Sequence, residues 1–126
     1  MPATILIVED EPTILTNTLD ILRFEGYVAI GAQNGRVGLE RAQQTLPDLI
    51  LCDIMMPEMD GYAVLRGIRD DPQTSAIPII MMSAKVDRET TAEAVEMGAT
   101  HYLAKPFSMP ELLNLVRATL KTRVLD

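Results

Sequence analysis

The feature that most constrains the fold is a regular alternation of five short apolar runs with five longer segments of helical character. The runs cover residues 4–8, 27–32, 49–52, 77–82 and 101–104. The first, third and fourth are apolar almost throughout, which is typical of strands buried on both faces of a parallel sheet. The alternation predicts an α/β fold of five strand–helix units, (βα)5.

Between the runs, apolar residues recur three or four positions apart, as on one face of a helix. The expected stripes are Leu15, Leu19 and Leu22; Leu39, Ala42 and Leu46; Leu65 and Ile68; Ala94 and Val95; and Leu112, Val116 and Leu120. Ser108 and Glu111 have the spacing of a capping box at the start of the last helix. Right-handed crossovers would place these helices on both faces of a doubly wound sheet. We expect a single domain over residues 1–126, with its core at about 4–120.

The composition excludes several classes of function. Apolar residues make up 48% of the 126 residues and charged residues 23%, which is typical of a folded soluble domain. No apolar run approaches the roughly 18 residues that a membrane helix needs, and no export signal is visible at the N-terminus. A lone cysteine, Cys52, offers no disulfide, so a cytoplasmic location is expected. The net charge of −7 argues against direct nucleic-acid binding.

Polar residues follow four of the five apolar runs. Glu9 and Asp10 follow the first, Asp53 the third, Ser83 the fourth and Lys105 the fifth. In open parallel sheets, ligands bind outside the carboxyl ends of the strands, where the strand order reverses. If the first and third runs are neighbours there, three carboxylates converge, flanked by a hydroxyl and an ammonium group.

Such a cluster suits phosphoryl chemistry. Adjacent carboxylates repel one another unless a cation intervenes, and oxygen ligands beside a phosphate suit Mg²⁺. Lys105 and Ser83 could contact phosphoryl oxygens, and Asp53 is a competent nucleophile. Taken alone, Asp53 could equally cap the following turn or helix. Its expected proximity to the other polar residues favours a phosphoryl site.

Four motifs at the strand ends carry a family resemblance. They are IVEDE at residues 7–11, DIMMPEMDG at 53–61, MSA at 82–84 and AKPF at 104–107. In this order and spacing they resemble the receiver domain of two-component response regulators, over essentially the whole chain. The resemblance implies the flavodoxin-like strand order 2-1-3-4-5.

The resemblance also implies roles for the acidic residues. Asp53 would accept a phosphoryl group from a phosphohistidine. Mg²⁺, with Mn²⁺ as a substitute, would be held by the carboxylates of Asp10 and Asp53 and by the backbone carbonyl of Met55. Glu9 would act through a metal-bound water. The module would assist its own phosphorylation and dephosphorylation without being a conventional enzyme.

Three further residues are implied to respond to phosphorylation. Ser83 would turn toward the phosphoryl oxygens, and Tyr102 matches the aromatic switch residue that turns inward when Ser83 moves. Lys105 would pair with the phosphoryl group, and the bond from Lys105 to Pro106 is often cis in this family. Met55 and Lys85 occupy two positions that tune dephosphorylation, and neither is of the type found in rapidly hydrolysing chemotaxis regulators.

Two kinds of partner are implied by the same resemblance. A sensor histidine kinase or histidine phosphotransfer protein would dock on Glu11, Pro12, Ile14, Leu15, Pro106 and Phe107. A downstream partner or output domain would use the face made by residues 87–97, 101–104 and the last helix. A phosphorylation-dependent dimer is a further possibility of the family. However, Thr100 and His101 replace the acidic pair that one subfamily of transcription factors uses to dimerise.

Two alternatives to a phosphorylation-controlled receiver remain. A pseudo-receiver would use the same fold for protein interaction without phosphate control. A phosphatase of the haloacid dehalogenase type would also use an aspartate nucleophile with Mg²⁺, but it typically carries D-x-D-x-T after its first strand. Here the first strand is followed by EDEP, at residues 9–12. The phosphate loops of flavodoxins and of Rossmann domains do not occur in the sequence.

Overall fold

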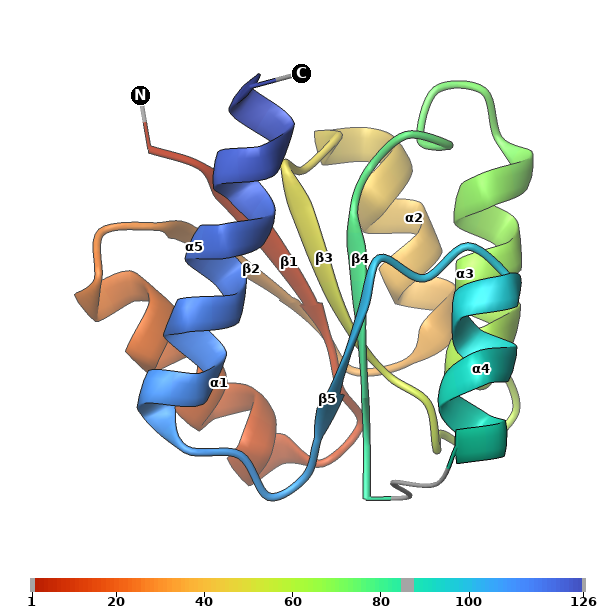
Figure 1. The fold of residues 1–126 in the computed structure, drawn as a ribbon, viewed down its shortest axis with the longest axis horizontal. Coiled ribbons are helices and arrows are strands. Elements are labelled where there is room, and N and C mark those ends of the chain that lie inside the picture. The colour runs from red at the N-terminus through yellow and green to blue at the C-terminus, as the bar shows by residue number, and fades with distance from the viewer. Residues whose placement is uncertain (1, 85–87, 126) are drawn as a thin grey trace.

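Five parallel strands form one sheet in the order β2-β1-β3-β4-β5, as expected (Figure 1). The computed structural model describes residues 2–84 and 88–125. The strands are β1 Thr4–Val8, β2 Val28–Ala32, β3 Leu49–Asp53, β4 Ile79–Ser83 and β5 His101–Ala104. The helices are α1 Pro12–Phe24, α2 Gly35–Thr45, α3 Gly61–Asp70, α4 Arg88–Glu96 and α5 Met109–Leu125. The predicted (βα)5 fold is therefore confirmed.

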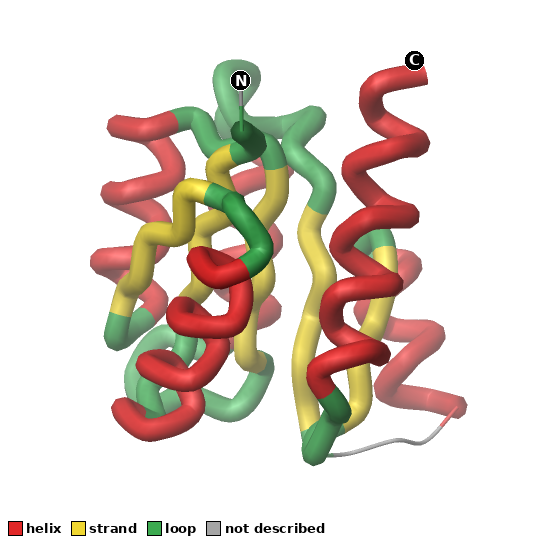
Figure 2. The backbone as a smooth tube through the Cα atoms, turned by 90° about the vertical axis from the view of Figure 1, so that its left-hand side faces the viewer, coloured by secondary structure: helices red, strands yellow, loops and turns green. Residues whose placement is uncertain are grey.

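The helices cover both faces of the sheet, with α1 and α5 on one side and α2, α3 and α4 on the other (Figures 1 and 2). Alternate residues of β1 divide between the two layers: Leu6 and Val8 pack toward α2, α3 and α4, whereas Ile5 and Ile7 pack toward α1 and α5. This division follows from the period of two along a strand. Because both faces are covered, the central strands are apolar almost throughout.

Side-chain caps fix where the helices begin. The Glu11 carboxylate accepts hydrogen bonds from the N–H groups of the first turn of α1, and Asn34 and Asp60 do the same for α2 and α3. The predicted capping box of α5 is present. The Glu111 N–H donates to Ser108 Oγ at 3.2 Å, and the Ser108 N–H donates to Glu111 Oε1 at 3.3 Å. These bonds satisfy N–H groups that have no partner within the helix.

Two residues of the predicted apolar stripes lie on the surface instead. Leu46 follows the last residue of α2 in a left-handed conformation, with φ of 47°, and is 51% exposed. Its backbone therefore turns away from the sheet before the stripe can continue. Val95 is 56% exposed, and only Ala94 of α4 is buried. Two strands also begin later than expected, β2 at Val28 and β4 at Ile79. For β4, the preceding Pro78 has no N–H to donate to a ladder.

Arg69 of α3 ties together the loops at the end of the sheet opposite the polar cluster. Its Nη1 donates to the carbonyls of Ser75 and Ile77, at 3.0 and 2.7 Å, and its Nε donates to the Gly98 carbonyl at 3.0 Å.

We expect Arg69→Met to lower the free energy of unfolding by about 2 kcal/mol, because three carbonyls lose a charged donor. Chemical denaturation measures this, with Arg66→Met on the exposed side of the same helix as the control. Equal stability of the two variants would contradict the role of these bonds.

Candidate functional site

The polar residues at the strand ends converge at one edge of the sheet. Pairing of β1 with β3 sets Val8 beside Cys52, so the residues that follow them, Glu9 and Asp53, come together. Glu9, Asp10 and Asp53 each offer a carboxylate oxygen, and these oxygens lie within 4.8 Å of one another. The structure therefore assembles the acidic cluster that the sequence predicted.

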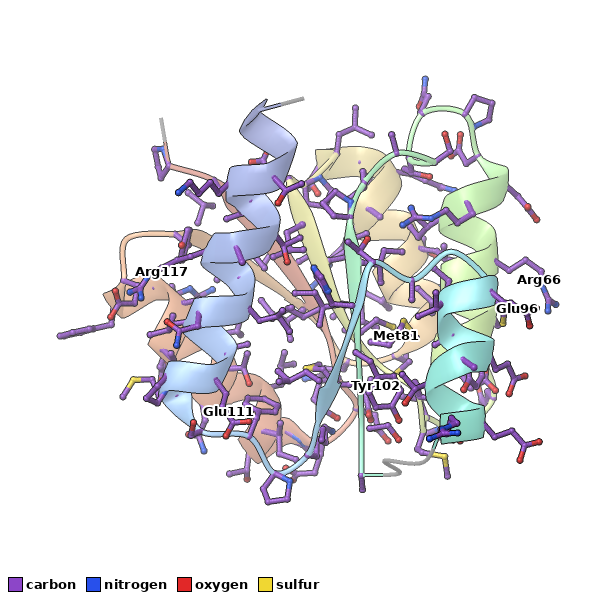
Figure 3. All side chains as sticks on the ribbon, viewed as in Figure 1. Arg66, Met81, Glu96, Tyr102, Glu111 and Arg117 are labelled. Carbon is purple, nitrogen blue, oxygen red and sulfur yellow. The ribbon has the colours of Figure 1, made fainter. Side chains whose placement is uncertain are left out.

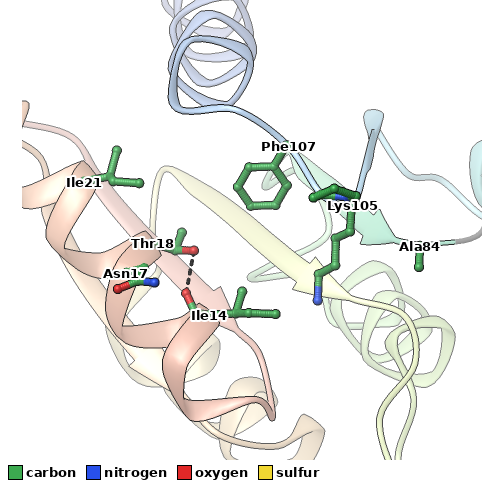
Figure 4. Close-up of a pocket in the computed structure, with 8 residues that line it drawn as sticks. Ile14, Asn17, Thr18, Ile21, Ala84, Lys105 and Phe107 are labelled. Carbon is green, nitrogen blue, oxygen red and sulfur yellow. Dashed lines mark hydrogen bonds between the residues drawn. The ribbon is translucent and has the colours of Figure 1, made fainter.

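Lys105 is the cation that faces this cluster. Its Nζ forms ion pairs with Glu9 Oε1 and with Asp53 Oδ1, the latter at 3.2 Å. Its backbone N–H donates to the Ser83 carbonyl at 2.8 Å, which holds the loop after β5 beside the end of β4. Figure 4 shows the extended Lys105 side chain reaching toward the strand ends. The peptide bond from Lys105 to Pro106 is cis, as expected.

Burial sets the electrostatics of the two deepest acids. Glu9 is 1% exposed and Asp53 is 4% exposed. Burial raises the pKa of both carboxyl groups, and Lys105 opposes the shift. The charge of Asp53 further raises the pKa of Glu9, and the charge of Asp10 further raises that of Asp53. Burial alone would lower the pKa of Lys105, but its hydrogen bond to Glu9 and the charges of both acids raise it on balance. Within residues 2–84 and 88–125, three carboxylates of the cluster face the Lys105 ammonium group, and this excess of negative charge attracts a further cation.

The chemistry of the donor set fits Mg²⁺. All three groups are hard oxygen ligands, the class that Mg²⁺ binds alongside a phosphate. Asp10 is only partly buried, whereas Glu9 and Asp53 are buried. Met55 lies two residues beyond Asp53, in the exposed loop that leads to α3. Glu9, Asp10, Asp53 and the Met55 carbonyl therefore remain the residues proposed to hold the metal.

Gly61 allows α3 to start directly against Asp53. A Cβ built on Gly61 would lie 2.4 Å from the Asp53 carbonyl oxygen, and the Gly61 N–H donates to the Ile54 carbonyl at 2.8 Å. We expect Gly61→Ala to lower stability by about 2 kcal/mol, and to slow the phosphoryl uptake that the sequence predicts for Asp53, since the backbone that carries Asp53 must shift. Thermal unfolding and phosphorylation rates measure the two effects. The control for stability is Ala63→Gly, which changes another residue of α3. Gly26→Ala would not serve as a control, because Gly26 has a positive φ that strains any side chain. A Gly61→Ala protein with unchanged rate would contradict the close approach.

The predicted switch residues lie on neighbouring strands, offset by two residues in register. Ser83 is buried at the end of β4, and β5 lies beside it, with Ser83 level with Ala104. Tyr102 is half-buried, level with Met81, and packs against the core layer that includes Ala94 of α4 (Figure 3). This placement is compatible with a switch that runs through β5. Lys85, the second predicted tuning residue, lies outside the described residues.

A cavity of about 390 Å³ adjoins the site between α1 and the loop after β5 (Figure 4). It is lined by Ile14, Asn17, Thr18, Ile21, Ala84, Lys105, Pro106 and Phe107. Three of these, Ile14, Pro106 and Phe107, belong to the predicted docking surface. Leu15, also predicted for docking, is 6% exposed and packs in the core. It therefore supports the docking surface from beneath and offers little area for direct contact with a partner.

The predicted docking surface does not include the part of this cavity that the middle of α1 contributes. Asn17, Thr18 and Ile21 follow Ile14 at spacings of three, four and seven residues, which is the signal of one helix face. Their mixed polarity concealed that signal. Glu11, at the N-terminus of the same helix, caps α1 and is exposed, as is Pro12.

No helix in residues 2–84 and 88–125 is long and apolar enough to span a lipid bilayer.

Comparison with known families and proteins gives a consistent result. Residues 5–117 match the model of the response regulator receiver domain. The chain is 36% identical to protein PilH of Pseudomonas aeruginosa, over 94% of this chain and 98% of PilH. It is 38% identical to the DNA-binding dual master transcriptional regulator RpaA of a Synechocystis species, over 93% of this chain and 48% of RpaA. Other curated relatives are longer: this chain spans about half the length of RpaA and only 9% of histidine kinase P4 of Formosa agariphila.

Solved structures agree with the sequence matches. The chemotaxis protein CheY4 of Vibrio cholerae superposes with a TM-score of 0.91, at 31% identity, over 94% of this chain and 99% of that chain. A putative response regulator from Chloroflexus aurantiacus superposes with a TM-score of 0.90, at 36% identity, over 96% of this chain and 99% of that chain.

Proposed function

The chain belongs to the response regulator receiver domain family, and on this premise we propose that it is a signalling module switched by phosphorylation of Asp53. The observation that carries the proposal is the setting of Asp53. Its carboxylate lies at the end of a buried strand, 3.2 Å from the Lys105 ammonium group and within 4.8 Å of two further acidic residues. A structural cap on a turn would need none of these neighbours.

We propose that Mg²⁺ is held by Asp10, Asp53 and the Met55 carbonyl, with Glu9 acting through a water. When bound, the ion would neutralise charge on the acceptor and on the transferring phosphoryl group. A carboxylate oxygen of Asp53 attacks the phosphorus of a phosphohistidine, the P–N bond breaks, and its electrons return to the imidazole. The Lys105 ammonium group then weakens its ion pairs with Glu9 and Asp53 and pairs with the new phosphoryl oxygens.

The buried position of Asp53 supports this chemistry in two ways. The rigid strand fixes the depth and direction of the nucleophile, so that positioning supplies much of the rate. The low exposure also strengthens every interaction between the phosphoryl group and the charges around it. Ser83 would donate its hydroxyl to a phosphoryl oxygen, and Tyr102 would follow the movement of Ser83.

Phosphorylation would then bias an equilibrium between two states of the α4-β5-α5 face. Ala94 is the only buried residue of α4, so this helix is held by few apolar contacts and can be repositioned at modest cost. We propose that a downstream partner or output domain recognises this face. A sensor histidine kinase or histidine phosphotransfer protein would dock over the cavity at Ile14 and Phe107, in the cytoplasm.

Phosphorylation by a small-molecule donor tests the proposal. With Mg²⁺ and acetyl phosphate or phosphoramidate, intact-mass spectrometry should show uptake of one phosphoryl group, removable by hydroxylamine and mapping to Asp53. EDTA should prevent the uptake. Beryllofluoride with Mg²⁺ should produce chemical-shift changes at Ser83, Tyr102 and α4. A folded protein that takes up no phosphoryl group and ignores beryllofluoride would instead be a pseudo-receiver.

We also expect the phosphorylated state to last minutes or longer rather than seconds. Met55 is exposed beside Asp53 and offers no amide or carboxylate to orient an attacking water. The decay of the phosphorylated mass after removal of the donor measures the lifetime. Met55→Asn should shorten it, because the amide can hold a water near the phosphorus. A wild-type lifetime of seconds would contradict the expectation.

A further inference from the structure

β2 is an edge strand, and its backbone has one side that faces away from the sheet (Figure 1). At the two ends of β2, the N–H of Val28 and the carbonyl of Ala32 bond to the chain of β1, each at 3.0 Å. Because hydrogen-bonding direction alternates along a strand, Ile30 also faces β1. The backbone groups of Ala29 and Gly31 therefore point outward, where the sheet has no further strand.

Two arginines donate hydrogen bonds to the outward-facing carbonyls of β2. Arg23, from the last turn of α1, donates through Nη2 to the Ala29 carbonyl at 2.8 Å. Arg41, from α2, donates through Nη1 to the Gly31 carbonyl. The two helices lie on opposite faces of the sheet, so the guanidinium groups close over the edge from both sides.

The space beside this edge is open. A cavity of about 450 Å³ lies between α1 and α2, with Gly31 and Arg41 among its lining residues. Val28, at the start of the strand, is exposed despite its apolar side chain, and so is Phe24, next to Arg23. An edge strand with open space and exposed apolar side chains is a template for pairing with another strand.

The register of β2 suits a second copy of the same strand. A two-fold axis at Ile30 would set Ala29 opposite Gly31 of the second copy, and Gly31 opposite its Ala29. In an antiparallel ladder, such opposed residues exchange both N–H···O bonds. The carbonyls that this pairing requires are the two that Arg23 and Arg41 occupy.

We propose that the β2 edge is a strand-pairing surface for a second copy of this chain, and that Arg23 and Arg41 hold it closed. Closure follows because the guanidinium groups take the acceptors that pairing would use. The surface is separate from the Asp53 site and does not depend on phosphorylation.

Removal of both arginines tests the proposal. The full chain with Arg23→Gln and Arg41→Gln should form dimers in a concentration-dependent manner by sedimentation velocity, whereas the wild type stays monomeric over the same range. Glutamine keeps part of the alkyl stem and a polar end but is too short to reach the carbonyls. The matched control replaces Arg66 and Arg88, which are exposed on α3 and α4, with glutamine, and it should stay monomeric.

Amide hydrogen exchange by NMR distinguishes strand pairing from other association. In the double variant, the amides of Ala29 and Gly31 should gain at least a tenfold protection on dimerisation, while Ile30 is protected in both states. If circular dichroism shows the double variant to be unfolded, each single variant should still associate more than the wild type. A folded double variant that stays monomeric, association of the control to the same extent, or dimers without protection of Ala29 and Gly31 would each overturn the proposal. So would a wild type that already pairs through this edge.

Discussion

Asp53→Asn is expected to abolish phosphoryl uptake completely while leaving a folded protein that is more stable than the wild type in the absence of Mg²⁺. The amide of asparagine is not a nucleophile toward a phosphoryl group, so the covalent step has no acceptor. The gain in stability follows from burial. The pKa of the Asp53 carboxyl is raised in the folded state, chiefly because burial disfavours its charge. A neutral amide of the same shape avoids that penalty.

The pH dependence of this gain has a definite sign. An acid whose folded pKa is raised binds more protons in the folded state than in the unfolded state. The stability of the wild type therefore falls as the pH rises from the ordinary aspartate range through the folded pKa. The advantage of Asp53→Asn should be largest near neutral pH and should vanish in acid, where the wild-type carboxyl is protonated. Thermal unfolding across this pH range, in EDTA, measures it.

The control for Asp53→Asn is Asp20→Asn, which removes an exposed carboxylate from α1. This variant should take up phosphate like the wild type and show no comparable change in stability. Uptake of a phosphoryl group by Asp53→Asn at another residue would contradict the assignment of the acceptor. A lower stability of Asp53→Asn at neutral pH without Mg²⁺ would contradict the electrostatic account of the site.

The acidic cluster could be predicted because it depends only on topology. Once the apolar runs are identified as parallel strands, their carboxyl ends must lie on one edge, and Asp10, Asp53, Ser83 and Lys105 follow directly. The choice of neighbours is also constrained, since each crossover is right-handed. What the sequence could not show is that the Lys105 ammonium contacts Glu9 as well as Asp53. That contact depends on side-chain packing within a few ångströms.

The features that the sequence did not predict arise from tertiary geometry. Leu46 continues an apolar period, but the backbone turns left-handed at that residue and leaves it exposed. Nothing in the sequence around Arg69 predicts its three acceptors, which are two carbonyls in the segment after α3 and the Gly98 carbonyl, 29 residues away. Arg23 and Arg41 are similar cases, because their acceptors belong to an edge strand that only the folded sheet defines. Periodicity reports which face of an element is apolar, and not which distant backbone groups need a donor.

Lys105→Met is expected to lower the free energy of unfolding by about 3 kcal/mol at neutral pH without Mg²⁺, the largest effect on stability among these variants. Methionine keeps most of the alkyl chain, so the lining of the cavity that Lys105 shares with Phe107 is retained. The buried carboxylates of Glu9 and Asp53, however, lose the ammonium group that both contact. The pKa of Lys105 is raised in the folded state, so its contribution is fully present at neutral pH and is lost only as the pH rises through that folded pKa, in strong alkali.

Two further measurements isolate the cause of the Lys105→Met effect. Mg²⁺ should recover part of the lost stability, because a cation returns to the acidic cluster, and Glu9→Gln added to Lys105→Met should recover part of it without Mg²⁺. Lys121→Met, an exposed position on α5, is the matched control and should be close to neutral. Coupling of this kind between Lys105 and Glu9 means that their separate effects do not add. If Glu9→Gln destabilises the Lys105→Met protein as much as it does the wild type, then the two side chains act independently and the ion pair is not what holds the site together.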